Sequence, residues 1–154
     1  MQTFHFEVNG KAMTVEAWPM ARLLDVLREH GFTGVKEGCG EGECGACSVL
    51  LNGQLLNSCL VPMAQTENTH ITTIEGVAIG DRLHAVQQAF LDYGGAQCGI
   101  CTPGMVLAAV QLLEKTPQPS VEDVRFALAG NLCRCTGYTK IFEAVLESCK
   151  GIRG

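Results

Sequence analysis

The chain has 154 residues, of which 47% are hydrophobic and 18% charged, and its formal net charge is −5. This length suits one ordinary domain or two small ones, and the apolar content argues against disorder. The acidic charge, without any Lys/Arg cluster, argues against a nucleic-acid partner, and the longest apolar run, 105–110, is too short for a membrane span. Nine cysteines, an odd number, with no visible signal peptide favour a reducing, cytoplasmic compartment over a disulfide framework.

The first elements are predicted to be a β-hairpin and a helix. Residues 4–17 alternate apolar and polar side chains around Asn9-Gly10, which is the strongest short-range signal of a hairpin. A helix is predicted over 21–30, because its leucines form one apolar stripe and Gly31 ends it.

A cysteine-rich loop follows, in which Cys39, Cys44 and Cys47 have the spacing C-x4-C-x2-C and Cys59 supplies a fourth thiol. Four thiolates in this order are the plant-type ferredoxin arrangement that binds a two-iron, two-sulfide cluster. Glycines in and before the loop allow the backbone to wrap tightly and to aim its N–H groups at the sulfurs. Disulfides or a structural zinc are the alternatives, although zinc sites usually show two C-x2-C knuckles.

The chain then returns to strand patterns before its composition changes. A second hairpin is predicted around Asn52-Gly53, and residues 69–74 are predicted to form one more strand. Two hairpins, one helix and a last strand suit a small mixed sheet of the β-grasp type. Because alternation ends after Glu75-Gly76, we predict two domains, 1–77 and 78–154.

The second domain is predicted to contain four amphipathic helices with short connections, which make a four-helix bundle. The third is expected to reach Leu128 and the fourth to reach about Cys149. The first of the four helices is expected to bury its apolar side chains, Leu83, Val86, Phe90 and Leu91. The signals that begin the four helices are Asp81, Thr102-Pro103, the capping box Ser120–Asp123 and Gly137-Tyr138.

The helical half carries a second set of cysteines, with Cys98 and Cys101 in a C-x2-C and Cys133 and Cys135 in a C-x-C. This combination is less familiar, and zinc is a serious alternative for it. Cys101 and Cys135 each come just before an expected helix. Helix N-termini would present partial positive charge and unpaired N–H groups to an anionic cluster. The ninth cysteine, Cys149, continues an apolar stripe and is expected to be a buried, inert thiol.

Segments 35–47, 97–104 and 130–138 together resemble the small iron–sulfur subunit of the xanthine dehydrogenase/aldehyde oxidase family of molybdenum hydroxylases. The resemblance covers about residues 3–150. It implies an α+β protein: an N-terminal β-grasp, plant-type ferredoxin-like domain with one [2Fe–2S] cluster, and a C-terminal four-helix-bundle domain with another. By that resemblance the first cluster is bound by Cys39, Cys44, Cys47 and Cys59, and the second by Cys98, Cys101, Cys133 and Cys135.

The same resemblance implies an electron-transfer subunit of a hetero-oligomeric oxidoreductase. Its partners would be a large molybdopterin-binding subunit and a medium FAD-binding subunit. Gln97 and Cys135 match family positions near the molybdopterin. Electrons would pass from the molybdopterin site through the second cluster, then the first, to FAD or another acceptor. No catalytic residue and no substrate chemistry are expected on this chain alone.

Two other functions are compatible with the cysteine pattern. One is a free-standing two-cluster carrier of the ferredoxin type, and the other is a zinc-stabilised structural or interaction module. Iron and acid-labile sulfide separate the cluster proteins from the zinc module.

Overall fold

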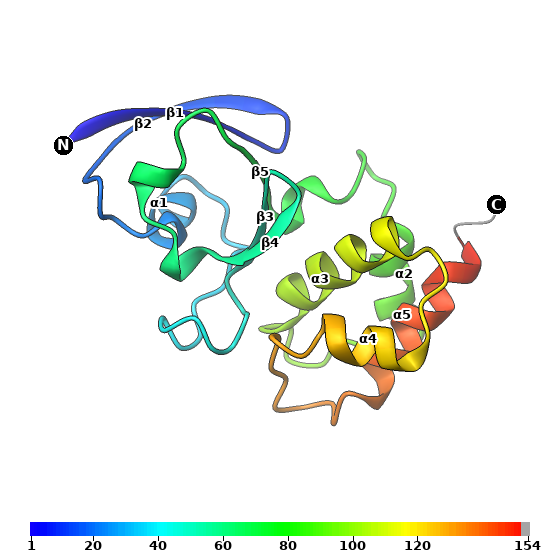
Figure 1. Ribbon diagram of the computed structural model, residues 1–154. Helices are drawn as coiled ribbons and strands as arrows, with labels where there is room; N and C mark the ends of the chain where they lie inside the picture. The colour runs from blue at the N-terminus through cyan, green and yellow to red at the C-terminus, as the bar shows by residue number, and fades with distance from the viewer. Residues whose placement is uncertain (152–154) are drawn as a thin grey trace.

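The computed structural model describes residues 1–151, with a β-sheet at one end of the molecule and most of the helices at the other (Figure 1). Five strands form the sheet in the order β2-β1-β5-β3-β4. Strands β1 and β5 are parallel, and the other neighbours are antiparallel. The strands are β1 (Gln2–Val8), β2 (Lys11–Ala17), β3 (Ser48–Leu51), β4 (Gln54–Asn57) and β5 (His70–Thr72).

Both predicted hairpins are present, and both turn on an Asn-Gly pair. The φ angles are 52° at Asn9 and 77° at Gly10, and 49° at Asn52 and 77° at Gly53. Positive φ at both central positions is the type I′ turn, whose twist matches that of the flanking strands. The turns therefore fix the register of β1 with β2 and of β3 with β4.

One helix, α1 (Leu23–Glu29), lies against the sheet and encloses the first hydrophobic core. It falls within the predicted range 21–30, and all three of its leucines are fully buried. They meet the inward side chains of β1, which alternate buried and exposed as a half-buried strand requires. Cys47 and Cys59 belong to this same core, which ties the first cysteine set to the best-packed part of the sheet domain.

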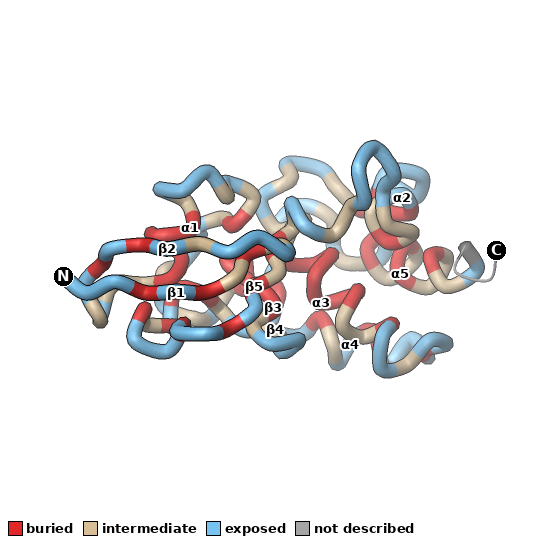
Figure 2. The backbone as a smooth tube through the Cα atoms, turned by 90° about the horizontal axis from the view of Figure 1, so that it is seen from above, coloured by how far each residue is buried: buried red, intermediate tan, exposed pale blue. Residues whose placement is uncertain are grey.

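Four helices share a second core: α2 (Ala85–Asp92), α3 (Thr102–Lys115), α4 (Val121–Ala127) and α5 (Thr139–Gly151). Helix α3 is the most buried of them, and it also packs on β3 and β4 (Figure 2). It therefore joins the two halves. Short 3-10 turns complete the described chain: η1 (Ser58–Leu60), η2 (Met63–Gln65) and η3 (Ile74–Gly76). Within residues 1–151, none of the helices combines the length and hydrophobicity needed to cross a bilayer.

The predicted start of the first of these helices was wrong. Helix α2 begins at Ala85, and its cap is His84, not Asp81: the His84 ring accepts a hydrogen bond from the N–H of Val86 at 3.2 Å. Val86 and Phe90 are buried as predicted. Leu83 and Leu91 are 40% and 64% exposed, because Leu83 precedes the helix and Leu91 lies about 100° around it from Phe90.

The other three starts differ in how well they matched the prediction. The Ser120 capping box is confirmed, with the Ser120 hydroxyl accepting from the N–H of Asp123 at 3.2 Å and the Asp123 carboxylate accepting from the N–H of Ser120 at 2.8 Å. Thr102 is not a cap, because it is already the first residue of α3 and Cys101 holds the cap position. Helix α5 begins at Thr139, directly after Tyr138, whose φ is 70°.

Candidate metal centres

Backbone N–H groups surround the first two sulfurs of the cysteine loop. The Cys39 Sγ accepts hydrogen bonds from the N–H groups of Glu41 at 3.3 Å, Glu43 at 3.4 Å and Cys44 at 3.4 Å. The Cys44 Sγ accepts from the N–H groups of Cys39 at 3.3 Å and Ala46 at 3.5 Å. The hydrogen bonds to the Cys39 sulfur, of which the one from the Glu41 N–H has the largest effect, lower the pKa of the Cys39 thiol to about 6. The loop is therefore shaped to hold sulfur in its anionic form.

The loop can approach these sulfurs closely because Gly38 has no side chain. A Cβ at Gly38 would lie 2.7 Å from the Cys44 Sγ, closer than real Cβ atoms approach a sulfur. The glycines that sequence analysis linked to tight wrapping therefore include one that the sulfur position requires.

The other two thiols of the first set are buried beneath the loop. Cys47 is 3% exposed and Cys59, in η1, is 4% exposed. Burial is the largest cause, and the hydrogen bond with the neighbouring Cys47 thiol the second largest, of a rise in the pKa of Cys59 to about 11. The hydroxyl of Ser58 donates to the Cys47 carbonyl at 2.7 Å and fixes η1 against the start of β3. The four thiols thus form two neighbouring pairs, Cys39 with Cys44 and Cys47 with Cys59.

The second set is also arranged as two pairs. The Sγ atoms of Cys98 and Cys135 are 3.5 Å apart, and both residues are exposed. Cys101 and Cys133 are half-buried, and burial, followed by the Cys133 thiol, raises the pKa of Cys101 to about 12. Residues 98–101 and 133–135, far apart in sequence, are therefore brought to one place by the packing of the helices around the second core.

Two side chains to which the sequence analysis gave no role at this site, Thr136 and Tyr138, support the second set. The hydroxyl of Thr136 donates to the Cys133 Sγ at 3.1 Å, and the Tyr138 hydroxyl accepts from the N–H of Cys133 at 2.9 Å. Cys101 caps α3, so one sulfur does lie at a helix N-terminus as predicted. Helix α5 begins only at Thr139. At Cys133, hydrogen bonds made by Thr136 and Tyr138 therefore take the place of the helix N-terminus that was expected after Cys135.

The paired thiols fit a two-iron cluster at each site. In a [2Fe–2S] cluster, each iron takes two protein ligands. Within residues 1–151, no three His, Cys, Asp or Glu side chains converge on a position for a single metal ion. No disulfide joins any of the nine cysteines, all of which are in the described part of the chain. Gln97 lies at the surface beside the exposed Cys98.

Comparisons with known proteins agree with this chemistry. Residues 6–76 match the 2Fe-2S iron–sulfur cluster binding domain, and residues 73–146 match the [2Fe-2S] binding domain. The chain is 50% identical over 144 residues to the nicotinate dehydrogenase small FeS subunit of Eubacterium barkeri, covering 93% of this chain and 92% of that relative. It is 44% identical over 147 residues to the xanthine dehydrogenase iron-sulfur-binding subunit of Escherichia coli, covering 94% and 92%.

The chain belongs to the iron–sulfur subunits of the xanthine dehydrogenase/aldehyde oxidase family. It is an electron-transfer subunit of a multisubunit oxidoreductase and has two [2Fe–2S] domains, which confirms the predicted family and the predicted cofactors of this chain. The crystal structure of aldehyde oxidoreductase from Desulfovibrio desulfuricans is similar, with a TM-score of 0.96 and 43% identity. The match covers 100% of this subunit but 17% of that chain, so the family also carries this unit within longer chains.

Proposed function

We propose that this subunit conducts electrons, one at a time, from a molybdopterin site on a large partner subunit to FAD or another acceptor. The observation that carries the proposal is the presence of two sets of four thiols in one chain. Each set is arranged as two pairs, and a backbone hydrogen bond from Leu132 to the Cys44 carbonyl connects the two sets. Each cluster, when bound, supplies a one-electron redox centre, and the chain supplies the thiolates, the hydrogen bonds to sulfur and the spacing.

The proposed ligands are those that the family resemblance implies. Cys39, Cys44, Cys47 and Cys59 hold the plant-type cluster, and Cys98, Cys101, Cys133 and Cys135 hold the helical-domain cluster. The pairing of the thiols and the N–H groups directed at the Cys39 and Cys44 sulfurs support this assignment. Structural zinc, which takes four ligands around one ion, is the alternative that metal and sulfide analysis separates from this assignment.

The proposed order of electron flow is the one that the family resemblance implies, with the second set nearest to the molybdopterin. Cys98, Cys135 and Gln97 share an exposed surface, which a large subunit could cover. We propose that Gln97 and Cys135 lie near the molybdopterin there. The first set has its own exposed member, Cys39, with the carboxylates of Glu41 and Glu43 beside it. This rim faces the FAD-binding medium subunit or another acceptor.

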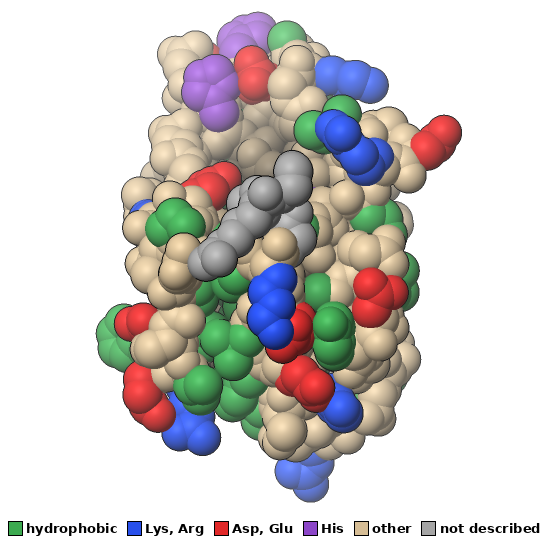
Figure 3. Space-filling view, turned by 90° about the vertical axis from the view of Figure 1, so that its right-hand side faces the viewer, with side chains coloured by type: hydrophobic (Ala, Val, Ile, Leu, Met, Phe, Trp, Pro, Cys, Tyr) green, Lys and Arg blue, Asp and Glu red, His purple; other side chains and the backbone are tan. Residues whose placement is uncertain are grey.

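The same proposal includes the finer domain description. Residues 1–77 form a β-grasp domain, and residues 78–154 form a four-helix bundle, of which 152–154 lie outside the described residues. Contacts between α2 and α5, α2 and α3, α3 and α4, and α4 and α5 support the bundle. On the face shown in Figure 3, acidic and basic side chains of the described residues are interspersed. Nine cysteines without a disulfide support the reducing, cytoplasmic compartment that is part of this proposal.

The test is metal and sulfide analysis of the complex purified through this subunit. The proposal expects about four irons and four acid-labile sulfides per chain, with a molybdopterin-binding chain in the same complex. Zinc without sulfide would overturn it. A chain that contains both clusters but purifies alone, and exchanges electrons with soluble flavoproteins, would favour the free-standing carrier instead.

A further inference from the structure

The two sets of cysteines differ in the kind of group that donates to their sulfurs. In the first loop, backbone N–H groups donate to the Cys39 and Cys44 sulfurs at 3.3–3.5 Å. In the second set, the hydroxyl of Thr136 donates to the Cys133 Sγ at 3.1 Å. Among the residues that the structure describes, Thr136 has the one side-chain hydroxyl that donates to a cysteine sulfur. Unlike a backbone donor, it can be removed by a single substitution.

The Thr136 hydroxyl is oriented by a second hydrogen bond. Its oxygen accepts from the N–H of Tyr138 at 3.1 Å. A hydroxyl has one O–H donor and two acceptor lone pairs, so the bond from Tyr138 uses a lone pair and leaves the proton for the Cys133 sulfur. The β-branched side chain of threonine also has few rotamers. The O–H of Thr136 is therefore directed at sulfur by its surroundings.

Tyr138 joins the two ends of this short segment. Its φ is 70°, a conformation that is uncommon for a residue other than glycine and costs backbone energy. Its hydroxyl reaches back to accept from the N–H of Cys133 at 2.9 Å, and its ring stacks on Phe142 with the centroids 6.1 Å apart. Residues 133–138 therefore form a loop that is closed by side chains and anchored to α5.

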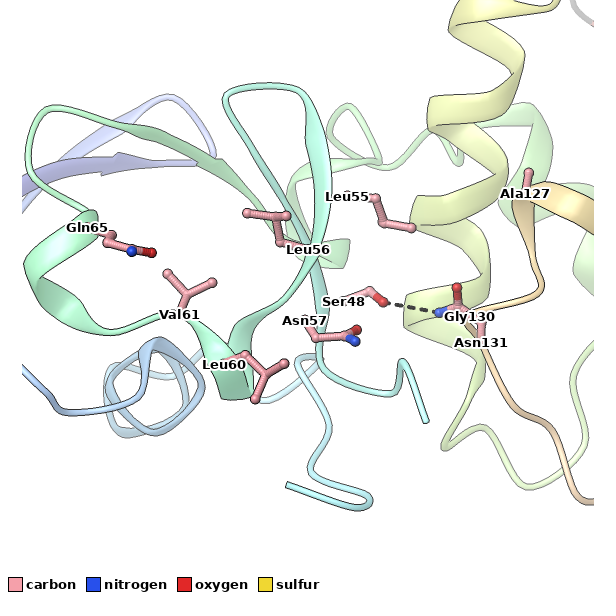
Figure 4. A pocket seen from close by; sticks show the side chains of 10 residues that line it. All are labelled: Ser48, Leu55, Leu56, Asn57, Leu60, Val61, Gln65, Ala127, Gly130 and Asn131. Atoms are coloured by element: carbon pink, nitrogen blue, oxygen red, sulfur yellow. Dashed lines mark hydrogen bonds between the residues drawn. The ribbon is translucent and has the colours of Figure 1, made fainter. Parts of the chain in front are cut away.

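A buried asparagine anchors the chain just before this loop. Asn131 is 3% exposed, and its side-chain amide donates to the Gly45 carbonyl at 3.0 Å and to the Ser48 hydroxyl at 3.1 Å. Figure 4 shows the bond to Ser48 at the edge of a groove between the two halves. The loop is thus held at both ends, which keeps Thr136 beside the Cys133 sulfur.

We propose that the Thr136 hydroxyl raises the reduction potential of the helical-domain cluster, with Tyr138 as its positioning residue. This rests on the proposed function, since Cys133 must be a ligand of that cluster. Reduction adds one electron, by which one ferric iron becomes ferrous, and the hydroxyl proton stays on the Thr136 oxygen. A donor at a ligand sulfur stabilises the added negative charge and so raises the potential.

This hydrogen bond affects how electrons divide between the two clusters. A higher potential at the helical-domain cluster favours electron transfer onto it from the molybdopterin site. It makes the onward step to the plant-type cluster less favourable by the same amount. Thr136 therefore adjusts the balance between the two steps, and it does so without being a ligand.

The experiment is Thr136→Val in the full multisubunit complex, because valine has a similar shape to threonine but lacks the hydroxyl. Thr136→Ser restores the hydroxyl. The matched control is Thr139→Val, since Thr139 is exposed and, within the described residues, its hydroxyl has no hydrogen bond to a cysteine. Iron content and the midpoint potential of each cluster are measured, the latter by redox titration with low-temperature electron paramagnetic resonance. The plant-type cluster is the internal reference in each sample.

We expect full iron content in Thr136→Val and a lower potential at the helical-domain cluster alone. The expected fall is about 59 mV, a tenfold change in a one-electron equilibrium, which is the order expected for one hydrogen bond to a charged group. Thr136→Ser and Thr139→Val should titrate as the unmodified complex does. An unchanged potential in the loaded valine variant, or an equal fall in the serine variant, would overturn the role of the hydroxyl and leave the proposed function intact. Absence of two clusters from the unmodified complex would instead overturn the proposed function.

Thr136→Ala is the second variant if valine prevents loading, and it should show the same fall in potential. If neither variant holds iron at the helical site while Thr136→Ser does, the hydroxyl serves assembly and the proposal is wrong. Tyr138→Phe removes the hydroxyl that accepts from the Cys133 N–H and retains the Thr136 donor. We expect it to load fully and to show a smaller fall at the same cluster. An unchanged potential in this variant would remove the positioning role of Tyr138.

Discussion

Gly104, in the first turn of α3, packs against the carbonyl oxygen of Gly45, in the first cysteine loop. This contact joins the helix that carries Cys101 at its cap to the loop that carries Cys44 and Cys47. The two cysteine sites are therefore not independent modules on a flexible linker. Their separation is set by backbone packing, which tolerates little change in volume.

Gly104→Ala should destabilise the subunit by about 1–3 kcal/mol, because the added methyl group overpacks this contact. The methyl group would overlap the Gly45 carbonyl and lie 2.9 Å from the Asn131 Nδ2. Urea denaturation of the loaded subunit measures the effect. Gly130→Ala is the matched control, since a Cβ there meets nothing within 4 Å. Equal stability of the two variants would show that the contact is loosely packed.

Cys135→Ala should remove the helical-domain cluster and leave the plant-type cluster in place, a loss of about two irons per chain. Its Sγ lies 3.5 Å from that of Cys98, and no hydrogen bond links it to the first cysteine loop. Iron analysis with low-temperature electron paramagnetic resonance distinguishes the two signals. Cys149→Ala serves as the control, because Cys149 lies outside both sets and its thiol donates to the Val145 carbonyl. Loss of both signals in the Cys135 variant would contradict two separate sites.

Gln97→Ala should leave both clusters and the fold unchanged, because the Gln97 side chain is exposed and supplies no thiol to either cluster. If it contacts the molybdopterin, reduction of the clusters from the substrate side should slow, while reduction by dithionite should not. Stopped-flow spectroscopy of the assembled complex measures both rates. Identical kinetics from the substrate side would remove Gln97 from the proposed electron path.

His84 gives the start of α2 a dependence on pH. Its neutral ring accepts a hydrogen bond from Val86, and burial lowers its pKa below the ordinary 6.5, with Glu114 opposing the shift. As the pH falls below 6.5, the unfolded chain binds a proton before the folded chain does. The stabilisation is therefore complete above that pH and is lost as the pH falls through the lower, folded-state pKa.

His84→Asn keeps a good N-cap acceptor but removes the titration. Its α2 amides should exchange hydrogen at similar rates to those of the wild type above pH 6.5 and more slowly than the wild type below it. Hydrogen exchange read by mass spectrometry compares the peptide over α2 with the peptide over α4, whose cap is Ser120. A constant difference between variant and wild type across the pH range would show that His84 is not titrating.

Local signals were the part of the structure that the sequence could predict. The Asn-Gly turns, the Ser120 capping box and the spacing of the cysteines each depend on residues a few positions apart. The start of α2 failed because a neutral histidine ring took the capping role that Asp81 would ordinarily fill. Asn131 was missed for a different reason: its partner Gly45 is 86 residues away, and only tertiary packing brings them together.

The burial of Cys47 and Cys59, at 3% and 4% exposure, has a consequence for biogenesis. Once η1 closes over β3, iron and sulfide cannot reach these sulfurs without local unfolding. Cys98 and Cys135 remain exposed in the folded chain. We therefore expect the first cysteine set to be harder to load with iron and sulfide once the sheet domain has folded, whereas Cys98 and Cys135 stay accessible in the folded chain.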